Sequence, residues 1–287
     1  MKIFGTITSI ITFCLFLIAP GISSEDYGSF NLKPGVRASA MAGTFVAIAD
    51  DPSTVFWNPA GLTNLKTVQL YPTYTSWYNS TSETGLSYSF PVNNAAWSWS
   101  IRHLDYRFLY HQTTDLINIC YANKPTPYLS WGIGYNYFSD IISDVSYTNQ
   151  SVDIGFLIKP PKLPKNVAIG VSSRRIFSLY DSFLNNLTAG ISYKKDLKSG
   201  GVNATSLIAV DVEVQNNQKP IYHLGAEYNI VNMTSIFVGV NSDKDNSTKN
   251  YFGGGLSLFF NPIRLDFAYL PHQNLGNTYK LAVNISQ

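Results

Sequence analysis

Apolar and polar residues alternate along most of the chain, in short segments that run from Thr67 to the C-terminus. In AAWSWSIRH (95–103), tryptophan and isoleucine alternate with serine and arginine, and LSWGIGYNY (129–137) repeats the pattern. A period of two residues is typical of a β-strand with one apolar face. About fourteen such segments begin near Val68, Leu86, Trp97, Ile117, Leu129, Val152, Val167, Leu187, Ile208, Tyr222, Ile236, Phe252, Ile263 and Tyr279.

The junctions between these segments follow a second pattern, in which every second one is short and turn-like. The short junctions are 91–94, 122–127, 160–165, 229–233 and 261–262, and longer polar junctions at 103–113, 139–150, 173–185 and 241–250 separate them. Only 194–204 is long where a short turn is expected. Short turns at one end and longer loops at the other are typical of bacterial outer-membrane barrels. The pattern predicts an all-β fold, a transmembrane antiparallel β-barrel of about 14 strands.

A water-soluble β-sandwich also has alternating strands and is the alternative interpretation. Its exposed face would need charge, whereas charged residues make up 13% of this chain, about half of the usual ~25%. The polar face consists mainly of Ser, Gly, Asn and Thr, which favours a barrel in lipid. The net charge of +2 provides no basic field for nucleic acid.

The N-terminus predicts export. Lys2 precedes an apolar stretch from about Ile7 to Ile18, and small residues follow it. This is a signal peptide, residues 1–24, with cleavage after Ser23 or Ser24; an N-terminal membrane anchor is the alternative. The remaining chain then keeps one cysteine, Cys120, predicted to face the barrel lumen as an inert packed thiol. We therefore expect location in the bacterial outer membrane.

Residues 25–66, between the signal peptide and the predicted barrel (67–287), are irregular. Asp50 or Asp51 is a suitable N-cap and Pro52 suits a first helical position, which predicts a short turn of helix over Ser53–Trp57. Pro59 and Gly61 are expected to end it. The segment is too small to bury a core of its own, so it must pack inside something else.

The stretch LKPGVRASAMAGTFVAIADDPSTVFWNPAGL (32–62), ahead of a barrel-like remainder, resembles the N-terminus of the FadL superfamily of outer-membrane proteins, and within it the PorV/PorQ-type branch. The resemblance implies a fourteen-stranded barrel whose N-terminal segment folds into the lumen as a hatch. The hatch motif comprises Gly35, Arg37, Asp50, Asp51, Phe56, Trp57, Asn58, Pro59, Ala60 and Gly61. The chain departs from the family in its shorter loops and in ending NISQ instead of an aromatic residue.

Charged residues also occur on the face predicted to line the lumen. They are Arg102, Asp153, Asp211, Glu213, Glu227, Arg264, Asp266 and Lys280. Charges inside a small barrel should pair with each other or with the hatch, through Arg37 or the Asp50–Asp51 pair. Such pairs could be purely structural or could hold and release a plug, and the aromatic segment 103–112 could grip an apolar ligand or form part of the rim.

No nucleophile elbow, metal-ligand spacing or nucleotide motif occurs in the sequence, so we expect no enzyme, no cofactor and no metal site. The leading hypothesis is a barrel that binds or transports hydrophobic, fatty-acid-like small molecules. The alternatives are a PorV-like barrel that docks secreted proteins for export, or a structural outer-membrane protein. Expected partners are membrane lipid, a hydrophobic solute, the outer-membrane assembly machinery and secretion partners, and no nucleic acid.

Overall fold

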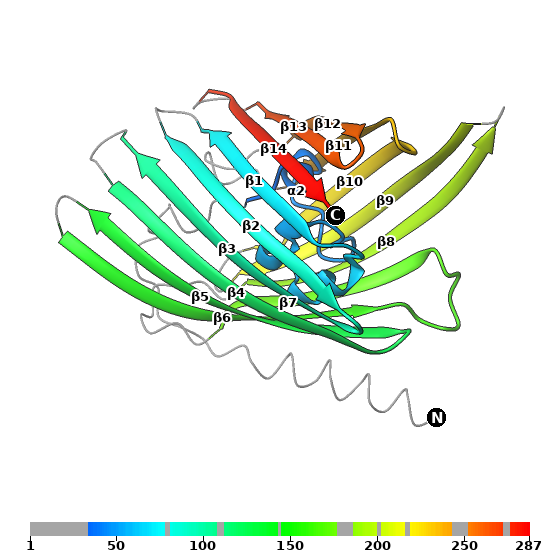
Figure 1. Cartoon of the computed structure of the whole chain (residues 1–287), viewed down its shortest axis with the longest axis horizontal. Helices are drawn as coiled ribbons and strands as arrows, with labels where there is room; N and C mark the ends of the chain where they lie inside the picture. The colour runs from blue at the N-terminus through cyan, green and yellow to red at the C-terminus, as the bar shows by residue number, and fades with distance from the viewer. Residues whose placement is uncertain are drawn as a thin grey trace.

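The computed structural model describes residues 34–77, 81–107, 112–142, 145–176, 186–199, 202–215, 219–242, 252–271 and 276–287. Fourteen antiparallel strands form one closed barrel, in which each strand pairs with its sequence neighbours and β1 pairs with β14 (Figure 1). The strands are β1 (Gln69–Ser76), β2 (Ser82–Val92), β3 (Ala95–Tyr106), β4 (Gln112–Thr126), β5 (Leu129–Ile142), β6 (Val145–Ile158), β7 (Val167–Ile176), β8 (Asn186–Ser199), β9 (Val202–Gln215), β10 (Ile221–Ile230), β11 (Thr234–Asn241), β12 (Phe252–Phe260), β13 (Ile263–Leu270) and β14 (Thr278–Ser286). The predicted fold class is confirmed.

The short junctions all lie at one end of the barrel, here called the turn end, and the opposite end is the loop end. Several predicted junctions were drawn too wide. At 122–127, β4 continues to Thr126. The strands β3 and β4 take up most of 103–113, and β5 and β6 pair through Ile142 and Val145 within 139–150. Within 194–204, residues 194–199 and 202–204 are paired strand as well, and the pairing reaches Ser199 and Val202. Loop prediction failed there because polar residues continue the ladder beyond the apolar band.

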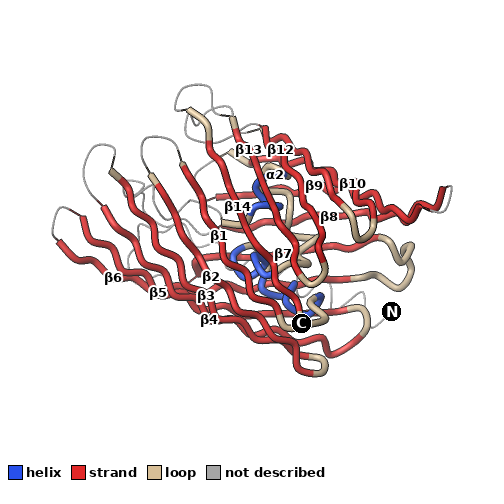
Figure 2. Tube along the Cα trace, turned by 45° about the horizontal axis from the view of Figure 1, so that its top comes forward, coloured by secondary structure: helices blue, strands red, loops and turns tan. Residues whose placement is uncertain are grey.

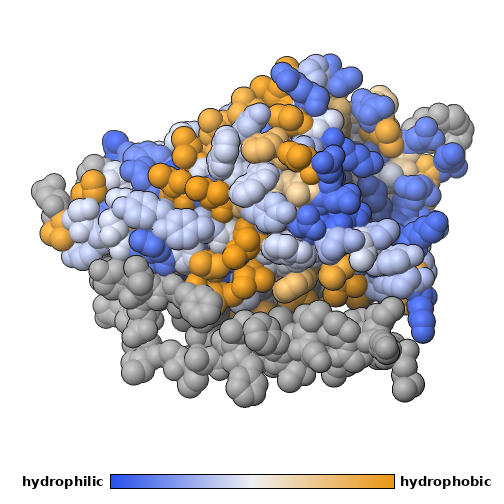
Figure 3. Space-filling view, turned by 60° about the horizontal axis from the view of Figure 1, so that its bottom comes forward, coloured by the Kyte–Doolittle hydropathy of each residue, from blue (hydrophilic) through white to orange (hydrophobic). Residues whose placement is uncertain are grey.

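The two faces of the wall differ as the two-residue period requires. On β3, Trp97, Trp99 and Ile101 are 41–55% exposed, whereas Ser98 and Ser100 are buried. Aromatic rings cluster on the outside near the turn end, where Trp97 and Tyr121 have ring centroids 4.7 Å apart. Figure 3 shows apolar side chains over the side of the barrel and hydrophilic ones gathered toward its turn end. An apolar band with an aromatic girdle is the exterior of a membrane-spanning barrel. Among the described residues, no helix combines the length and hydropathy needed to cross a bilayer.

A charge in the middle of this band should be costly. Ile119 lies at the centre of β4 and is 43% exposed on the outer face. We expect Ile119→Arg to destabilise the folded barrel in lipid by about 2–4 kcal/mol, because the guanidinium would sit near the bilayer midplane. Urea-dependent unfolding in liposomes measures this, with Val92→Arg at the turn end of β2 as the control, expected to cost about 1 kcal/mol or less. If Ile119→Arg and Val92→Arg destabilised the barrel equally, Ile119 would not lie nearer the bilayer midplane than Val92.

Residues 34–66, here called the hatch segment, lie inside the barrel, where Figure 2 shows the helices enclosed by the strands. The segment contains the α-helix α2 (Val36–Ala40) and the 3-10 helices η2 (Pro52–Phe56) and η3 (Pro59–Asn64). Helix α2 lies against β11–β14, and η3 lies against β2–β6. The predicted signal peptide and residues 25–33 fall outside the described residues.

The predicted turn of helix is present, with Asp51 as the N-cap: its side chain accepts a hydrogen bond from the Ser53 amide. This helix ends at Phe56, ahead of Pro59, as expected. The sequence did not predict that Pro59 and Gly61 would lie within a second 3-10 helix, η3. Asn58 caps η3 and Pro59 occupies its first turn, as proline can where no amide donor is needed. Gly61 is required for close packing: a Cβ there would lie 2.3 Å from the Ala49 carbonyl oxygen.

Candidate functional site: the contact between the hatch segment and the barrel wall

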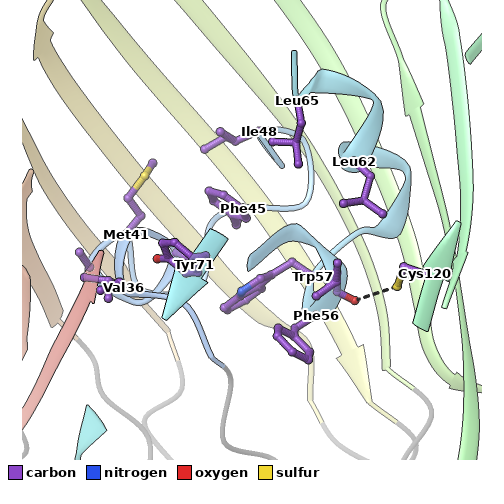
Figure 4. Close-up of a cluster of buried hydrophobic side chains, with 14 of the residues drawn as sticks. Val36, Met41, Phe45, Ile48, Phe56, Trp57, Leu62, Leu65, Tyr71 and Cys120 are labelled. Carbon is purple, nitrogen blue, oxygen red and sulfur yellow. Dashed lines mark hydrogen bonds between the residues drawn. The ribbon is translucent and has the colours of Figure 1, made fainter. Parts of the chain in front are cut away.

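The hatch segment supplies half of the residues of the main apolar core, and the inner face of the barrel supplies the other half (Figure 4). Phe45 and Trp57 meet edge to face with ring centroids 6.2 Å apart, and both are at least 95% buried. The Trp57 indole N–H donates to the Pro34 carbonyl at 2.9 Å, which ties the end of η2 to the start of the segment. Gly35 allows this fold because its φ of +94° is disfavoured for other residues and a Cβ would lie 2.6 Å from the Ser53 hydroxyl.

Glycines on the inner wall let the hatch backbone approach the strands directly. A Cβ at Gly132, Gly170, Gly239 or Gly253 would lie within 2.1–2.6 Å of a hatch backbone atom. These glycines come from β5, β7, β11 and β12, so they follow the hatch segment around the barrel. Any larger residue would push the hatch segment away from the wall, because real Cβ atoms essentially never approach other atoms so closely.

Two polar side chains fix the hatch segment to the wall. Asp211 on β9 accepts hydrogen bonds from the backbone amides of Phe45 and Val46, at 2.7 and 2.9 Å, with one carboxylate oxygen. Asn58 donates to the carbonyls of Val46 at 2.8 Å and Phe156 at 3.1 Å, and so joins two parts of the hatch segment to β6. Buried hydrogen bonds to a charged acceptor are among the stronger ones.

Arg37 of α2 forms the main charged link. Its guanidinium pairs with Asp50 inside the hatch segment and with Glu227 on β10, to which Nε also donates at 2.9 Å. The Arg37 side chain is 7% exposed and lies 5.6 Å from the centroid of the Phe45 ring. A single buried cation therefore compensates carboxylates on both the hatch segment and the wall.

Arg264 and Asp266 of β13 form a second charged group beside the first. Arg264 pairs with Asp266 at 2.9 Å, and its Nη2 lies 3.8 Å from the fully buried Asp51 carboxylate. The Asp51 oxygen that faces Arg264 also lies 3.9 Å from Arg37. Hatch and wall charges thus alternate in sign across their contact.

The remaining predicted lumen charges lie closer to the loop end. Arg102 pairs with Glu83 at 2.8 Å, and the Lys280 ammonium lies 4.4 Å from the centroid of the Trp77 ring. Glu213 lies 3.6 Å from Arg174, a residue that the alternation did not single out. Asp153 is used within the wall: it accepts a hydrogen bond from the Arg175 amide at 2.8 Å, at a bulge between β6 and β7.

Sequence reasoning missed several wall contacts. His223 on β10 forms a hydrogen bond of 2.7 Å to the Ala42 carbonyl, and Arg174 donates to the Phe56 carbonyl at 3.2 Å. A lone histidine and a strand arginine have no pattern that marks such a role. The glycines of the wall were visible as small residues at lumen positions, and that signal could have located the track of the hatch segment.

These contacts hold the hatch segment in the lumen as a plug. The charged side chains described above form ion pairs or accept hydrogen bonds from the backbone. Among the described residues, no group of three or more His, Cys, Asp or Glu side chains could hold a metal ion. Cys120 is fully buried against the hatch segment, with its sulfur 3.9 Å from the Val55 carbonyl oxygen. Because this thiol is covered by η2, its reaction with a maleimide would report displacement of the hatch segment.

This reporter gives a test of the Asn58 link. We expect Asn58→Ala to destabilise the seated hatch segment by about 1–3 kcal/mol, because buried carbonyls lose their donor. Maleimide should then label Cys120 of the folded barrel about 10- to 100-fold faster. The control is Asn123→Ala on β4, where the side-chain amide donates to the Tyr121 hydroxyl of the same strand at 3.4 Å; this variant should be labelled at the same rate as the parent. An unchanged rate for Asn58→Ala would mean that this residue does not hold the hatch segment.

Comparisons with known proteins place the fold. Residues 20–115 match the model of the Uncharacterised protein family (UPF0164), which covers less than half of the chain. No curated protein matches. The CymD monoaromatic hydrocarbon channel is similar at a TM-score of 0.64 and 14% identity, with 88% of this chain and 97% of that chain covered. The Ralstonia pickettii toluene transporter TbuX has a TM-score of 0.60 and 13% identity, over 90% and 99% of the two chains.

A Pseudomonas aeruginosa FadL homologue is similar over 93% of this chain and 99% of that chain, at a TM-score of 0.54 and 10% identity. The fold of this protein is therefore that of FadL-type hydrocarbon channels, and it is a barrel of the outer-membrane type. At these identities the similarity concerns the fold, so the function has to be argued from the site.

Proposed function

We propose that this protein is a bacterial outer-membrane channel that takes up hydrophobic small molecules through a lumen closed by the hatch segment. The observation that carries the proposal is the seated plug: α2, η2 and η3 lie inside the barrel and are held to the wall by ion pairs and hydrogen bonds. A plug held by a few charged and backbone contacts can be shifted when a solute changes those contacts. The fold neighbours titled hydrocarbon channels support this substrate class.

The path proposed for the solute begins at the loop end. Phe56 lies on the loop-end side of the hatch segment, with the Arg102 guanidinium 5.2 Å from the centroid of its ring. The neighbouring Trp57 and the Phe56 carbonyl contact Arg174. A hydrophobic molecule that displaces these contacts would weaken the hold of the wall on η2, and the hatch segment would then shift. The mechanism involves binding and conformational change and no covalent chemistry.

The experiment is the identification of bound solute. The mature protein is purified as a folded barrel in detergent, denatured and extracted, and the extract is analysed by mass spectrometry against a detergent-matched, unrelated barrel. We expect a stoichiometric apolar compound, and a lower yield of it from Asn58→Ala, in which η3 is loosened. A folded barrel with no solute above the membrane-lipid background would overturn the channel proposal.

A second candidate function is a barrel that docks secreted proteins, as in the PorV/PorQ-type branch that the hatch motif resembles. The observation in its favour is the tight seal: wall glycines bring the hatch backbone into direct contact with four strands. A plug that never moves suits docking better than transport. Cys120 that stays unreactive in the presence of candidate hydrocarbons would favour this function, whereas solute-dependent labelling would favour the channel.

A further inference from the structure

The turn end of the barrel is strongly basic. Lysines are concentrated in three segments there, 122–128, 159–166 and 193–207, which together contain seven of them and one acidic residue, Asp196. An uncompensated cluster of this size creates a positive field on one end of the molecule. In Figure 3 hydrophilic side chains gather at this end of the barrel.

Lys66 adds an eighth lysine at this end, and together with three of the seven it lines one side of the lumen mouth beside η3. Lys124, Lys159 and Lys194 continue the lumen-facing alternation of β4, β6 and β8, and Lys66 follows η3 directly. The Lys159 ammonium donates to the Asn64 side chain of η3 at 3.4 Å. Partial burial lowers the pKa of Lys159, and the positive charges of its three lysine neighbours lower it further, against the opposite effect of Asp50.

The other four lysines project from the rim. Lys162 and Lys165 are exposed on the β6–β7 connection. Lys195 and Lys198 are exposed on β8. The pairing of β8 with β9 continues there to Ser199 and Val202, beyond the last pair of β8 with β7, which joins Tyr193 and Val167. The two groups together form a basic surface that extends from the lumen mouth to the hairpin.

We infer that this basic surface docks an acidic segment of a soluble protein on the side of the membrane that the turns face. The lysines are spread over several segments and do not converge on one point, so the surface fits an extended polyanion better than a small ion. Lys124, Lys159 and Lys194 continue the lumen-facing positions of their strands and so lie away from the lipid-facing band, which argues against a lipid headgroup as the ligand. The inference rests on the proposed orientation, with short turns facing the periplasm, and does not depend on the solute.

The test uses the mature barrel in nanodiscs of phosphatidylcholine and a fluorescein-labelled decaglutamate peptide. Fluorescence anisotropy should show binding that weakens as salt is added, since exposed charges are screened, and a decaglutamine peptide should not bind. Replacing Lys162, Lys165, Lys195 and Lys198 with glutamine should raise Kd about tenfold or more. All four are exposed, so the barrel should fold normally.

Two controls are needed. One tests whether charge or side-chain structure determines binding, and the other tests whether the turn end or the loop end binds the peptide. The fourfold Lys→Arg variant keeps the charge and should bind like the parent, and Arg107→Gln with Lys219→Gln removes charge at the loop end and should leave Kd unchanged. Absence of peptide binding, or equal binding by the Lys→Gln variant, would overturn the inference. So would lysine-dependent attraction to phosphatidylglycerol nanodiscs without peptide binding, which would assign the surface to lipid. Solute binding, measured separately on the same samples, tests the channel proposal independently.

Discussion

Replacement of Arg37 by alanine should release the hatch segment while the barrel stays closed. The guanidinium compensates Asp50 and Glu227 and is almost fully buried, so its removal leaves carboxylates without a partner at the contact. Breaking a buried ion pair in this way costs about 3–5 kcal/mol. Maleimide labelling of Cys120 should therefore accelerate at least about a hundredfold. The barrel itself should keep its strands, because the pairing of β1–β14 does not involve this side chain.

The matched control is Arg107→Ala, which breaks an exposed pair with Asp105 and should leave the labelling rate within about twofold of the parent. The double variant Arg37→Met with Glu227→Gln tests the mechanism, since it removes the wall carboxylate together with its partner. It should label more slowly than Arg37→Ala, because less uncompensated charge remains buried. If Arg37→Ala labels like the parent, Arg37 does not hold the hatch segment and the charged contact is incidental.

The sequence was most informative where one simple period controls the structure. Strands such as 95–106 and 129–142 could be predicted because every second residue must face lipid or the lumen, and a closed barrel follows from repeated antiparallel neighbours. Strand ends were less predictable, since backbone pairing continues past the apolar band. At 194–199 the ladder runs through three lysines, which no hydrophobic pattern marks.

The candidate site shows where local reasoning stops. The Asp51 cap of η2 was predictable because a cap and its amide are two residues apart in sequence. A pair between Arg37 and one of the lumen charges was expected. Which charge it would be could not be predicted, because Glu227 lies 190 residues away and only the closed barrel and the seated hatch segment bring them together. Gly61 shows the same limit. Read locally, this glycine ends a helix, but it lies inside η3, and it is needed there because Thr54 and Ala49 leave no room for a Cβ.

The glycines of the wall give the last prediction, Gly132→Val. A Cβ at Gly132 on β5 would lie 2.5 Å from the Pro59 carbonyl carbon and 2.6 Å from the Ala60 amide, and valine adds two methyl groups beyond it. Both of these atoms belong to the backbone of η3, so a change of side-chain rotamer cannot relieve the clash and the whole helix has to move. The steric cost should reach about 3 kcal/mol or more, at the upper end for overpacked sites. Valine suits the strand itself, so the barrel should still form.

The readout is again Cys120, which neighbours this site because it pairs with Gly134 across β4 and β5. We expect labelling to accelerate about a hundredfold or more, with the barrel shown to be intact by its heat-dependent mobility in gel electrophoresis. The control is Gly254→Val on β12, where the nearest atom to a Cβ is 3.7 Å away and the labelling rate should not change. Equal labelling of Gly132→Val and the parent would mean that the hatch segment is not seated against β5. A hundredfold difference between the two valine variants would mean that the glycines keep the lumen closed, because both changes add the same side chain to a strand of the same barrel.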